Sequence, residues 1–373
     1  MKRRFANGGC GEVELTRKRK RKVCGLWSLP DDVALTCLAK LSRVDLAALA
    51  MASKIHRPLV VSPELWNLRW RMGCVEPCLY VFLHIFPDPW PRWFIFHPAK
   101  RRLKRIFSKL YPAPESGSCF VANSWGFFVI GGLKNGKPTS EVTFFDCFQH
   151  RVYRFPPMMM ARCGASASQI DDKIYVFGGV ADSESDSSNY VEVFDLRTLT
   201  WELLSVSTPP KMPLKIQRSA VVKEKKEICA VDEKGQSFFF SPEKRMFVAT
   251  GKTDSKARHR NHWCSMGSFL FCHDSRHRRI LWCLPRDLDW KEVKGLQELR
   301  GYDICKLCTN RAGKVFIFWK VPQTLELWSA PISLRQRETP EGLELSGDID
   351  WYRALLQHSC LGVNLLHAGF AYT

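Results

Sequence analysis

The sequence predicts a mainly β protein, in which similar small sheets repeat behind a short helical module. Three observations support this prediction. Residues 29–54 (LPDDVALTCLAKLSRVDLAALAMASK) carry apolar side chains at helical spacing. FVIGG (128–132) and VFGG (176–179) repeat one pattern 47 residues apart. Short apolar strands separated by turn residues then continue, with little helical periodicity before residues 351–357.

The first segment, residues 1–24, is predicted to be a basic disordered N-terminus. Residues 1–22 contain nine Lys or Arg against two Glu, although the whole 373-residue chain carries a net charge of +19. Adjacent like charges repel one another and favour an extended, solvated chain. The run RKRKRK is a candidate nuclear import signal, with a plain solvated tail and a nucleic-acid-binding arm as alternatives. It comprises Arg17, Lys18, Arg19, Lys20, Arg21 and Lys22.

Residues 25–73 are predicted to form three short helices. Pro30 suits the first turn of a helix, and the two aspartates after it favour the positive end of the helix dipole. Ser42 begins a capping-box pattern for a second helix. Ser62 is the expected N-cap of a third helix, which ends at Gly73. About 45 residues enclose too small a core to be stable alone, so this module should lean on a partner or on the next domain.

The helical module resembles an F-box, the domain that docks on the Skp-type adaptor of SCF ubiquitin ligases. The resemblance rests on LPDDV at 29–33 and on the spacing of the leucines that follow, although SKIH (53–56) stands where many F-boxes have Cys-x-x-Trp. It implies that the Leu-Pro pair and the apolar helix faces fit the adaptor. The alternative is an ordinary helical subdomain core. The expected adaptor-binding residues are Leu29, Pro30, Val33, Leu38, Leu41, Leu46 and Leu49.

Residues 74–373 are predicted to form repeated four-stranded units. The central apolar strands FVIGG, VFGG, CAVD, FLFCH and FIFWK end at residues 132, 179, 232, 273 and 320. After each of these comes another strand, a short turn and an aromatic residue. The spacing of six residues recurs, from Asp195 to Trp201 and from Leu284 to Trp290. Glycines without Cβ allow a sharp turn and a close approach of neighbouring backbones. The clearest repeats are 118–157 and 164–205, and the later ones are degenerate.

A period near 50 residues with a strand, a diglycine and an aromatic resembles the kelch repeat, in which one four-stranded sheet makes one blade of a β-propeller. The residues expected to shape the blades are Gly131, Gly132, Tyr153, Gly178, Gly179, Trp201 and Trp290.

Six blades are expected. The residues from 79 to 373 give about 49 per blade for six blades, and five blades would need nearly 60. LYVFLHI (79–85) and WFIFHPAKRRLKRI (93–106) should supply three strands of the first blade, and the C-terminal LGVNLL (361–366) the fourth. This pairing would close the ring and remove exposed sheet edges. Residues 335–349 look like an insertion.

The chain as a whole resembles the plant F-box/kelch-repeat proteins of the SKP-interacting-partner type, over about 340 residues. The resemblance implies a non-catalytic, substrate-recognition subunit of an SCF-type E3 ubiquitin ligase. The F-box would dock on a Skp-type adaptor, linked indirectly to cullin and RING subunits, and the propeller would bind a protein substrate. The expected location is the nucleus or cytoplasm, in soluble form and without secretion. The alternatives are a non-degradative F-box/kelch scaffold and a basic nuclear interaction protein.

Loops at one propeller face are the expected substrate contacts, because irregular segments on a rigid scaffold are free to vary. The candidates are the acidic, Ser-rich residues 181–189 and the basic residues 252–262. Each is equally well interpreted as a solvated loop.

No cofactor or metal is expected. The 15 cysteines are odd in number and scattered, and the only CxxC, Cys305 and Cys308, lacks a second ligand pair. The ten histidines show no cluster of the kind that a copper-oxidase propeller would need. The sequence shows no membrane-spanning apolar run and no signal-peptide core. It also lacks a zinc finger or RNA-binding motif, so nucleic-acid binding is not favoured.

Overall fold

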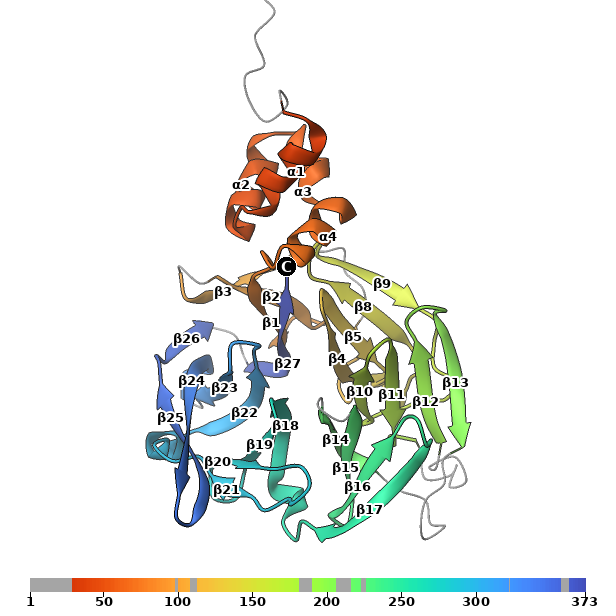
Figure 1. Ribbon diagram of the computed structural model, residues 1–373, viewed down its shortest axis with the longest axis vertical. Coiled ribbons are helices and arrows are strands. Elements are labelled where there is room, and N and C mark those ends of the chain that lie inside the picture. Colours follow the sequence, from red (N-terminus) through yellow and green to blue (C-terminus); the bar gives the residue numbers. More distant parts are fainter. Residues whose placement is uncertain are drawn as a thin grey trace, which may run out of the picture. The chain divides into compact units, whose positions relative to one another are not determined.

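The computed structural model describes residues 29–97, 100–107, 113–180, 190–205, 216–222, 226–321, 323–356 and 362–373. The chain divides into two compact units, Met1–Cys74 and Val75–Thr373. The first unit is helical and the second is built from β-sheets (Figure 1).

The helical unit contains four helices in its described part: α1 (Asp31–Ala39), α2 (Arg43–Ala52), α3 (His56–Val60) and α4 (Pro63–Arg71). Both predicted N-caps are confirmed. The Ser42 hydroxyl accepts a hydrogen bond from the Asp45 amide at 3.1 Å, and Ser62 accepts one from Leu65 at 3.2 Å. The sequence did not predict α3, because a helix of five residues is too short to show an apolar period.

The core of the helical unit is small and is completed by a buried arginine. Leu38, Ala39, Leu46, Val60 and Leu65 form the apolar cluster. Arg69 on α4 is fully buried, and its guanidinium donates to the backbone carbonyls of Ala39 (3.0 Å) and Cys74 (2.8 Å). A cation at the C-terminal end of a helix satisfies carbonyls that lack a partner within the helix. Arg69 therefore ties α4 to the end of α1.

The second unit is a six-bladed β-propeller. Blade 1 contains β27 (Gly362–Tyr372), β1 (Pro77–Phe86), β2 (Arg92–His97) and β3 (Arg102–Arg105). Blade 2 contains β4 (Cys119–Asn123), β5 (Gly126–Ile130), β8 (Val142–Asp146) and β9 (Arg151–Phe155), with the small hairpin β6 (Leu133–Lys134) and β7 (Lys137–Pro138). Blade 3 contains β10 (Ser166–Ile170), β11 (Lys173–Phe177), β12 (Tyr190–Asp195) and β13 (Thr200–Ser205).

The remaining blades follow the same order from inner to outer strand. Blade 4 contains β14 (Ile216–Val222), β15 (Glu227–Asp232), β16 (Gln236–Ser241) and β17 (Met246–Thr253). Blade 5 contains β18 (Arg260–Met266), β19 (Phe269–Asp274), β20 (Arg279–Cys283) and β21 (Lys291–Glu292). Blade 6 contains β22 (Asp303–Thr309), β23 (Lys314–Val321), β24 (Glu326–Thr339), β25 (Gly342–Ile349) and β26 (Arg353–Leu356). Two short 3-10 helices, Ala257–His259 and Gln297–Gly301, connect these strands.

The C-terminal strand closes the ring, as predicted. β27 pairs antiparallel with β1 from Pro77 opposite Tyr372 to Phe86 opposite Gly362. It is the innermost strand of blade 1, whose other strands come from the start of the propeller unit (Figure 1). The two ends of the propeller are therefore joined within one sheet.

Residues 335–349, which looked inserted, extend the sheet of blade 6. β24 continues to Thr339 and turns back as β25, while β26 pairs with the first part of the same β24 edge. The Lys294 amide donates to the Leu345 carbonyl, and the Gly347 amide donates to the Lys294 carbonyl, both at 2.9 Å. The hairpin thus links blade 6 to the chain that follows β21 of blade 5.

The apolar core of the propeller lies between neighbouring blades. Each of six buried clusters joins two adjacent blades. Between blades 1 and 2, Trp93 stacks on Phe145 with ring centroids 4.5 Å apart. Between blades 3 and 4, Phe177 meets Phe240 edge to face at 5.4 Å. Such aromatic pairs add to the stabilisation from buried area.

The diglycines allow the chain to pass close to the next blade. Gly131 has a φ of +61°, and a Cβ there would lie 2.5 Å from the Arg162 carbonyl oxygen. Gly178 has a φ of +64°, and its Cβ would lie 2.6 Å from the Ile216 carbonyl oxygen. Both positions therefore require glycine for conformation and for space. Gly132 and Gly179 also have positive φ angles.

Gly131→Ala is expected to lower the free energy of unfolding by roughly 2–4 kcal/mol, because it adds a steric clash to the cost of positive φ. Gly136→Ala is the matched control. Gly136 has a φ of +69° but no atom within 4 Å of its Cβ position, so we expect a loss of about 1–2 kcal/mol from conformation alone. Urea denaturation measures both values. Equal losses would show that the close backbone approach at Gly131 has no energetic consequence.

Candidate functional site

The predicted adaptor-binding residues divide between the core and the surface of the helical unit. Leu38 and Leu46 are 2% and 4% exposed and belong to the apolar core. Leu49 packs against that core and is partly buried. These three side chains hold the unit together, so they offer a partner little free surface.

The remaining predicted residues lie on the outside of α1. Leu29, Val33 and Leu41 are about 40% exposed, and Pro30 is exposed too. Val33 and the exposed Cys37 are four residues apart and therefore lie on one side of α1. Leu29 precedes this helix and Leu41 follows it. Apolar side chains are thus exposed on α1 and at both of its ends.

A second group of exposed apolar side chains, on α2 and just after it, was not predicted from the sequence. Val44 and Met51 on α2 are 60% and 79% exposed, and Ile55, just beyond the end of this helix, is 65% exposed. The signal was present, because α2 (RVDLAALAMA) is apolar on nearly every side and only one side can face a small core. We call Leu29, Val33, Leu41, Val44, Met51 and Ile55 the exposed apolar set. Contiguous apolar side chains on a surface mark interaction sites.

The aromatic residues expected to shape the blades have different roles. Trp201 on β13 donates a hydrogen bond from Nε1 to the Pro156 carbonyl at 2.8 Å, which links blade 3 to the end of blade 2. Trp290 packs edge to face on Trp263 at 5.4 Å within blade 5. Tyr153 on β9 is half exposed, and its hydroxyl donates to Gln149 Oε1 at 2.9 Å.

A buried ion pair holds the second diglycine, and no sequence pattern predicted it. Arg162 Nε lies 2.8 Å from Glu192 Oε1, and both side chains are fully buried. Arg162 also donates to the Gly178 carbonyl at 2.6 Å. The Glu192 carboxylate accepts a further hydrogen bond from the Met159 amide at 2.6 Å. Every charged group at this point thus has partners, which makes its burial tolerable.

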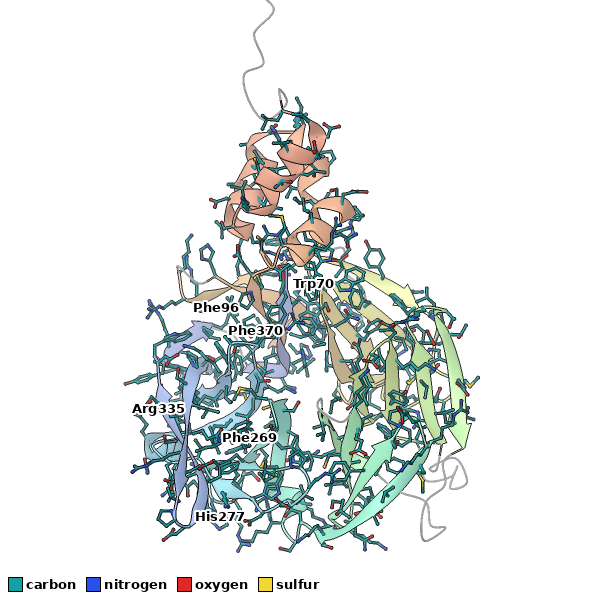
Figure 2. The ribbon with its side chains drawn as sticks, viewed as in Figure 1. Trp70, Phe96, Phe269, His277, Arg335 and Phe370 are labelled. Carbon is teal, nitrogen blue, oxygen red and sulfur yellow. The ribbon has the colours of Figure 1, made fainter. Side chains whose placement is uncertain are left out.

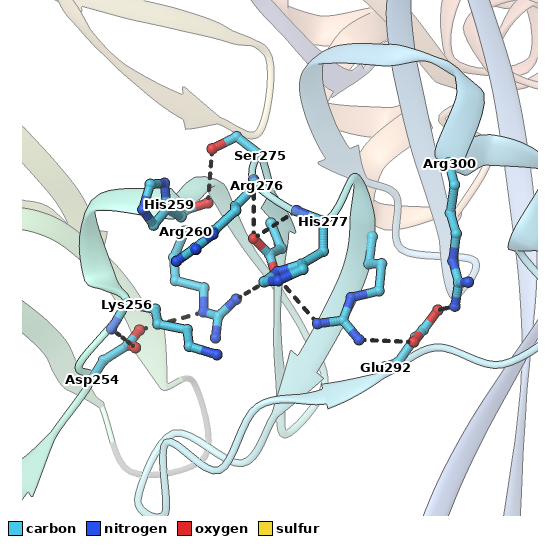
Figure 3. Close-up of polar contacts among 11 residues, drawn as sticks. Asp254, Lys256, His259, Arg260, Ser275, Arg276, His277, Glu292 and Arg300 are labelled. Carbon is cyan, nitrogen blue, oxygen red and sulfur yellow. Dashed lines mark hydrogen bonds and ion pairs between the residues drawn. The ribbon is translucent and has the colours of Figure 1, made fainter.

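A second ion-pair network lies in blade 5 and includes part of the basic segment 252–262 (Figure 3). Arg260 NH1 lies 3.1 Å from Asp274 Oδ2, and His277 Nδ1 lies 2.9 Å from the same oxygen. Burial alone would raise the pKa of Asp274, but the hydrogen bond from His277 and the charge of Arg260 outweigh it and lower the pKa to about 2. Arg279 joins Asp274 to Glu292. Arg260 is therefore a structural residue, while Lys252 and Arg258 of the same segment are exposed.

The other predicted interaction segments, residues 17–22 and 181–189, lie outside the described residues. Cys305 and Cys308 are free thiols whose pKa is raised by burial, to about 12 for Cys305. In the part of the chain that the structure describes, no three His, Cys, Asp or Glu side chains gather as a metal site. None of the described helices is both long and apolar enough to cross a membrane.

A cavity of about 1070 Å³ at the centre of the propeller is a further candidate site. Its wall includes residues of the six inner strands β4, β10, β14, β18, β22 and β27. These strands surround the middle of the ring in Figure 1. Every blade therefore contributes to the wall of this cavity.

Six blades, five of them four-stranded and the sixth five-stranded, define the propeller unit as a kelch-type β-propeller, and two of the blades have a diglycine after the second strand. The family profile described as "FKB95, Kelch-repeats domain" matches residues 97–356. The chain is 27% identical to F-box/kelch-repeat protein At4g39580 of Arabidopsis thaliana over 346 residues, 88% of this chain and 89% of that protein. It is 31% identical to putative F-box/kelch-repeat protein At3g27910 of the same plant over 349 residues, 88% of each chain. The chain belongs to the F-box/kelch-repeat proteins, which gives it a substrate-adaptor role in general.

Proposed function

We propose that this chain is the substrate-recognition subunit of an SCF-type E3 ubiquitin ligase. Residues 25–73 act as the F-box that docks on a Skp-type adaptor, and residues 74–373 act as the kelch propeller that binds the target protein. The adaptor connects this chain to the cullin and RING subunits, where ubiquitin transfer takes place. The names of the relatives support the two modules in this order.

Binding both partners at once raises the reaction rate through proximity. A target on the propeller has its lysines near the ubiquitin-charged enzyme at a high effective concentration, so a chance encounter is no longer needed. The rigid sheets of the propeller suit this role because they keep the binding loops in a fixed arrangement. This chain positions the target protein, and the other subunits carry out the transfer of ubiquitin.

The exposed apolar set is the observation that carries the proposal. The described part of the helical unit has one small core and leaves six large apolar side chains exposed on α1 and α2 or next to their ends. Burying each of them in a partner groove contributes roughly 1.5–3 kcal/mol if burial is complete. Such a surface is costly for an isolated domain and favourable for an adaptor-bound one.

Val33→Asp/Met51→Asp is expected to weaken adaptor binding by at least about 100-fold, because each change puts a charge into an apolar interface. The full chain is purified, and its affinity for a recombinant Skp-type adaptor is measured by calorimetry. Exposed residues are chosen because changing Leu38 or Leu46 would remove core packing. Unchanged circular dichroism of the variant separates lost binding from lost folding.

Val248→Asp is the matched control. Val248 is 46% exposed on β17 of the propeller, so the same chemical change is made at similar exposure outside the helical unit. This variant should bind the adaptor with wild-type affinity. If the double variant does so too, the proposed docking surface is wrong.

A further inference from the structure

The central cavity has an ammonium group in its wall that pairs with no carboxylate among the described residues. Lys306 lies on β22, is half-buried and lines the cavity. Within the described ranges its side chain makes neither a hydrogen bond nor an ion pair. The only carboxylate among the described lining residues is Asp171, and its Oδ2 already accepts from Lys226 Nζ at 2.8 Å.

The groups around Lys306 add positive potential. Arg218, on β14 of blade 4, donates to the Arg260 carbonyl (2.8 Å) and to Asn261 Oδ1 (3.0 Å), which are uncharged oxygens. Burial lowers the pKa of Lys306 and of Arg218, and the charge of Arg218 lowers the pKa of Lys306 further. A cation removed from water without an opposite charge is costly. An anion in the cavity would remove that cost.

A second buried polar group in the cavity wall also has no partner. His367 on β27 is 9% exposed, and neither ring nitrogen has a hydrogen-bond partner among the described residues. Its ring stacks on Phe120 at 4.5 Å. Burial and the charge of Lys306 hold the pKa of His367 well below its usual range, so the ring is neutral. A neutral imidazole can donate one hydrogen bond to an anionic oxygen.

The rest of the cavity wall combines apolar and aromatic side chains with a similar share of polar ones. Trp263, Met266, Phe269 and Phe370 line it, together with hydroxyl groups such as that of Thr309. Figure 2 labels Phe269 and Phe370, on β19 and β27. A volume of about 1070 Å³ is at the upper end of the range that holds a small organic ligand.

We propose that the central cavity binds a small organic anion, with a carboxylate or phosphate at Lys306 and an apolar or aromatic body against the surrounding rings. Lys306 supplies the charge, and His367 supplies a hydrogen bond. The aromatic side chains bury the body of the ligand. This site is separate from the helical unit, so it does not depend on adaptor docking.

The test uses the full chain and three probes that differ only in the polar group: 2-naphthoate, 2-naphthyl phosphate and 2-naphthalenemethanol. Calorimetry at low ionic strength gives the affinities. At least one anion should bind 10-fold or more tightly than the neutral alcohol, and the better anion assigns carboxylate or phosphate. The proposal is overturned if the alcohol binds equally well or if neither anion binds at millimolar concentration.

Lys306→Met should lower the affinity for the better anion about 10-fold, and Lys306→Arg should keep most of it. Lys244→Met is the matched control, because Lys244 is an exposed lysine of blade 4 outside the cavity wall. Lys306→Met should also leave the melting temperature equal to or above that of the wild type, since it removes an unpaired cation. A merely structural lysine would show the reverse pattern, with stability lost and anion binding unchanged.

An acidic polypeptide is the competing occupant. A capped tetra-glutamate peptide should fail to displace the bound naphthyl anion. The opposite result is that the peptide displaces the bound naphthyl anion at a lower concentration than free naphthyl anion needs, and that Lys306→Met abolishes this displacement. That result would overturn the assignment to a small molecule and favour a peptide segment.

Discussion

Arg162→Met is expected to lower the free energy of unfolding of the propeller by about 3–5 kcal/mol. The change leaves the Glu192 carboxylate fully buried without its cation. It also removes the hydrogen bond to the Gly178 carbonyl, which holds the second diglycine in place. Chemical denaturation, followed by the fluorescence of the tryptophans in the blades, measures the loss.

Arg197→Met is the matched control for this prediction. Arg197 pairs with Asp172 in the same blade, NH2 to Oδ2 at 2.6 Å, but the two side chains are 80% and 51% exposed. Exposed ion pairs contribute about 0–1 kcal/mol. The double variant Arg162→Met/Glu192→Gln should recover part of the loss, because it removes the isolated charge. If Arg162→Met and Arg197→Met have the same effect, the buried pair has no special role in the fold.

The repeated strands could be predicted from the sequence because each blade repeats a local pattern. The apolar strands ending near residues 132, 179, 232, 273 and 320 are the second strands β5, β11, β15, β19 and β23 of five blades. The first blade and its closure by the C-terminus were also predicted correctly. Strand alternation and diglycines are short-range signals, so a single sequence suffices to show them.

Contacts between distant residues could not be predicted in this way. Arg162 and Glu192 are 30 positions apart, and no short pattern relates them. The network of Asp274 and its arginines has the same long-range character (Figure 3). The extension of β24 into a hairpin was missed because its outer half is polar on both sides and lacks an apolar alternation.

The candidate sites were also predicted only in part, because their geometry depends on contacts between distant residues. Helical spacing identified the apolar positions of α1 and α2, but it does not reveal which side faces a core that is formed by other helices. For this reason the predicted set mixed the core residue Leu38 with the exposed Val33. Lys306 was not predicted as a site residue, because a lysine in a strand usually faces solvent. Only closure of the ring places it in a cavity wall.

Closure of the ring depends on one strand. β27 is the only described strand that joins the C-terminal end of the propeller to its beginning, and Ala368 lies at its centre opposite Val81. Ala368 is 1% exposed and packs in the cluster between blades 6 and 1. Opening this strand would expose two sheet edges and two blade-to-blade cores at once. A defect in β27 should therefore affect the whole ring more than a defect in an outer strand.

Ala368→Asp is expected to destabilise the propeller by about 3–5 kcal/mol, because it buries a carboxylate without a partner in the strand that closes the ring. Asn364→Asp is the control, since Asn364 is exposed on the same strand and the change introduces the same charge at a solvated position. Hydrogen exchange gives the sharper readout. In Ala368→Asp the amides of β1 and β27 should lose protection before those of blades 3 and 4, because the ring opens at its closure. Uniform loss of protection in all six blades would show instead that the ring has no weak point there and unfolds as one unit.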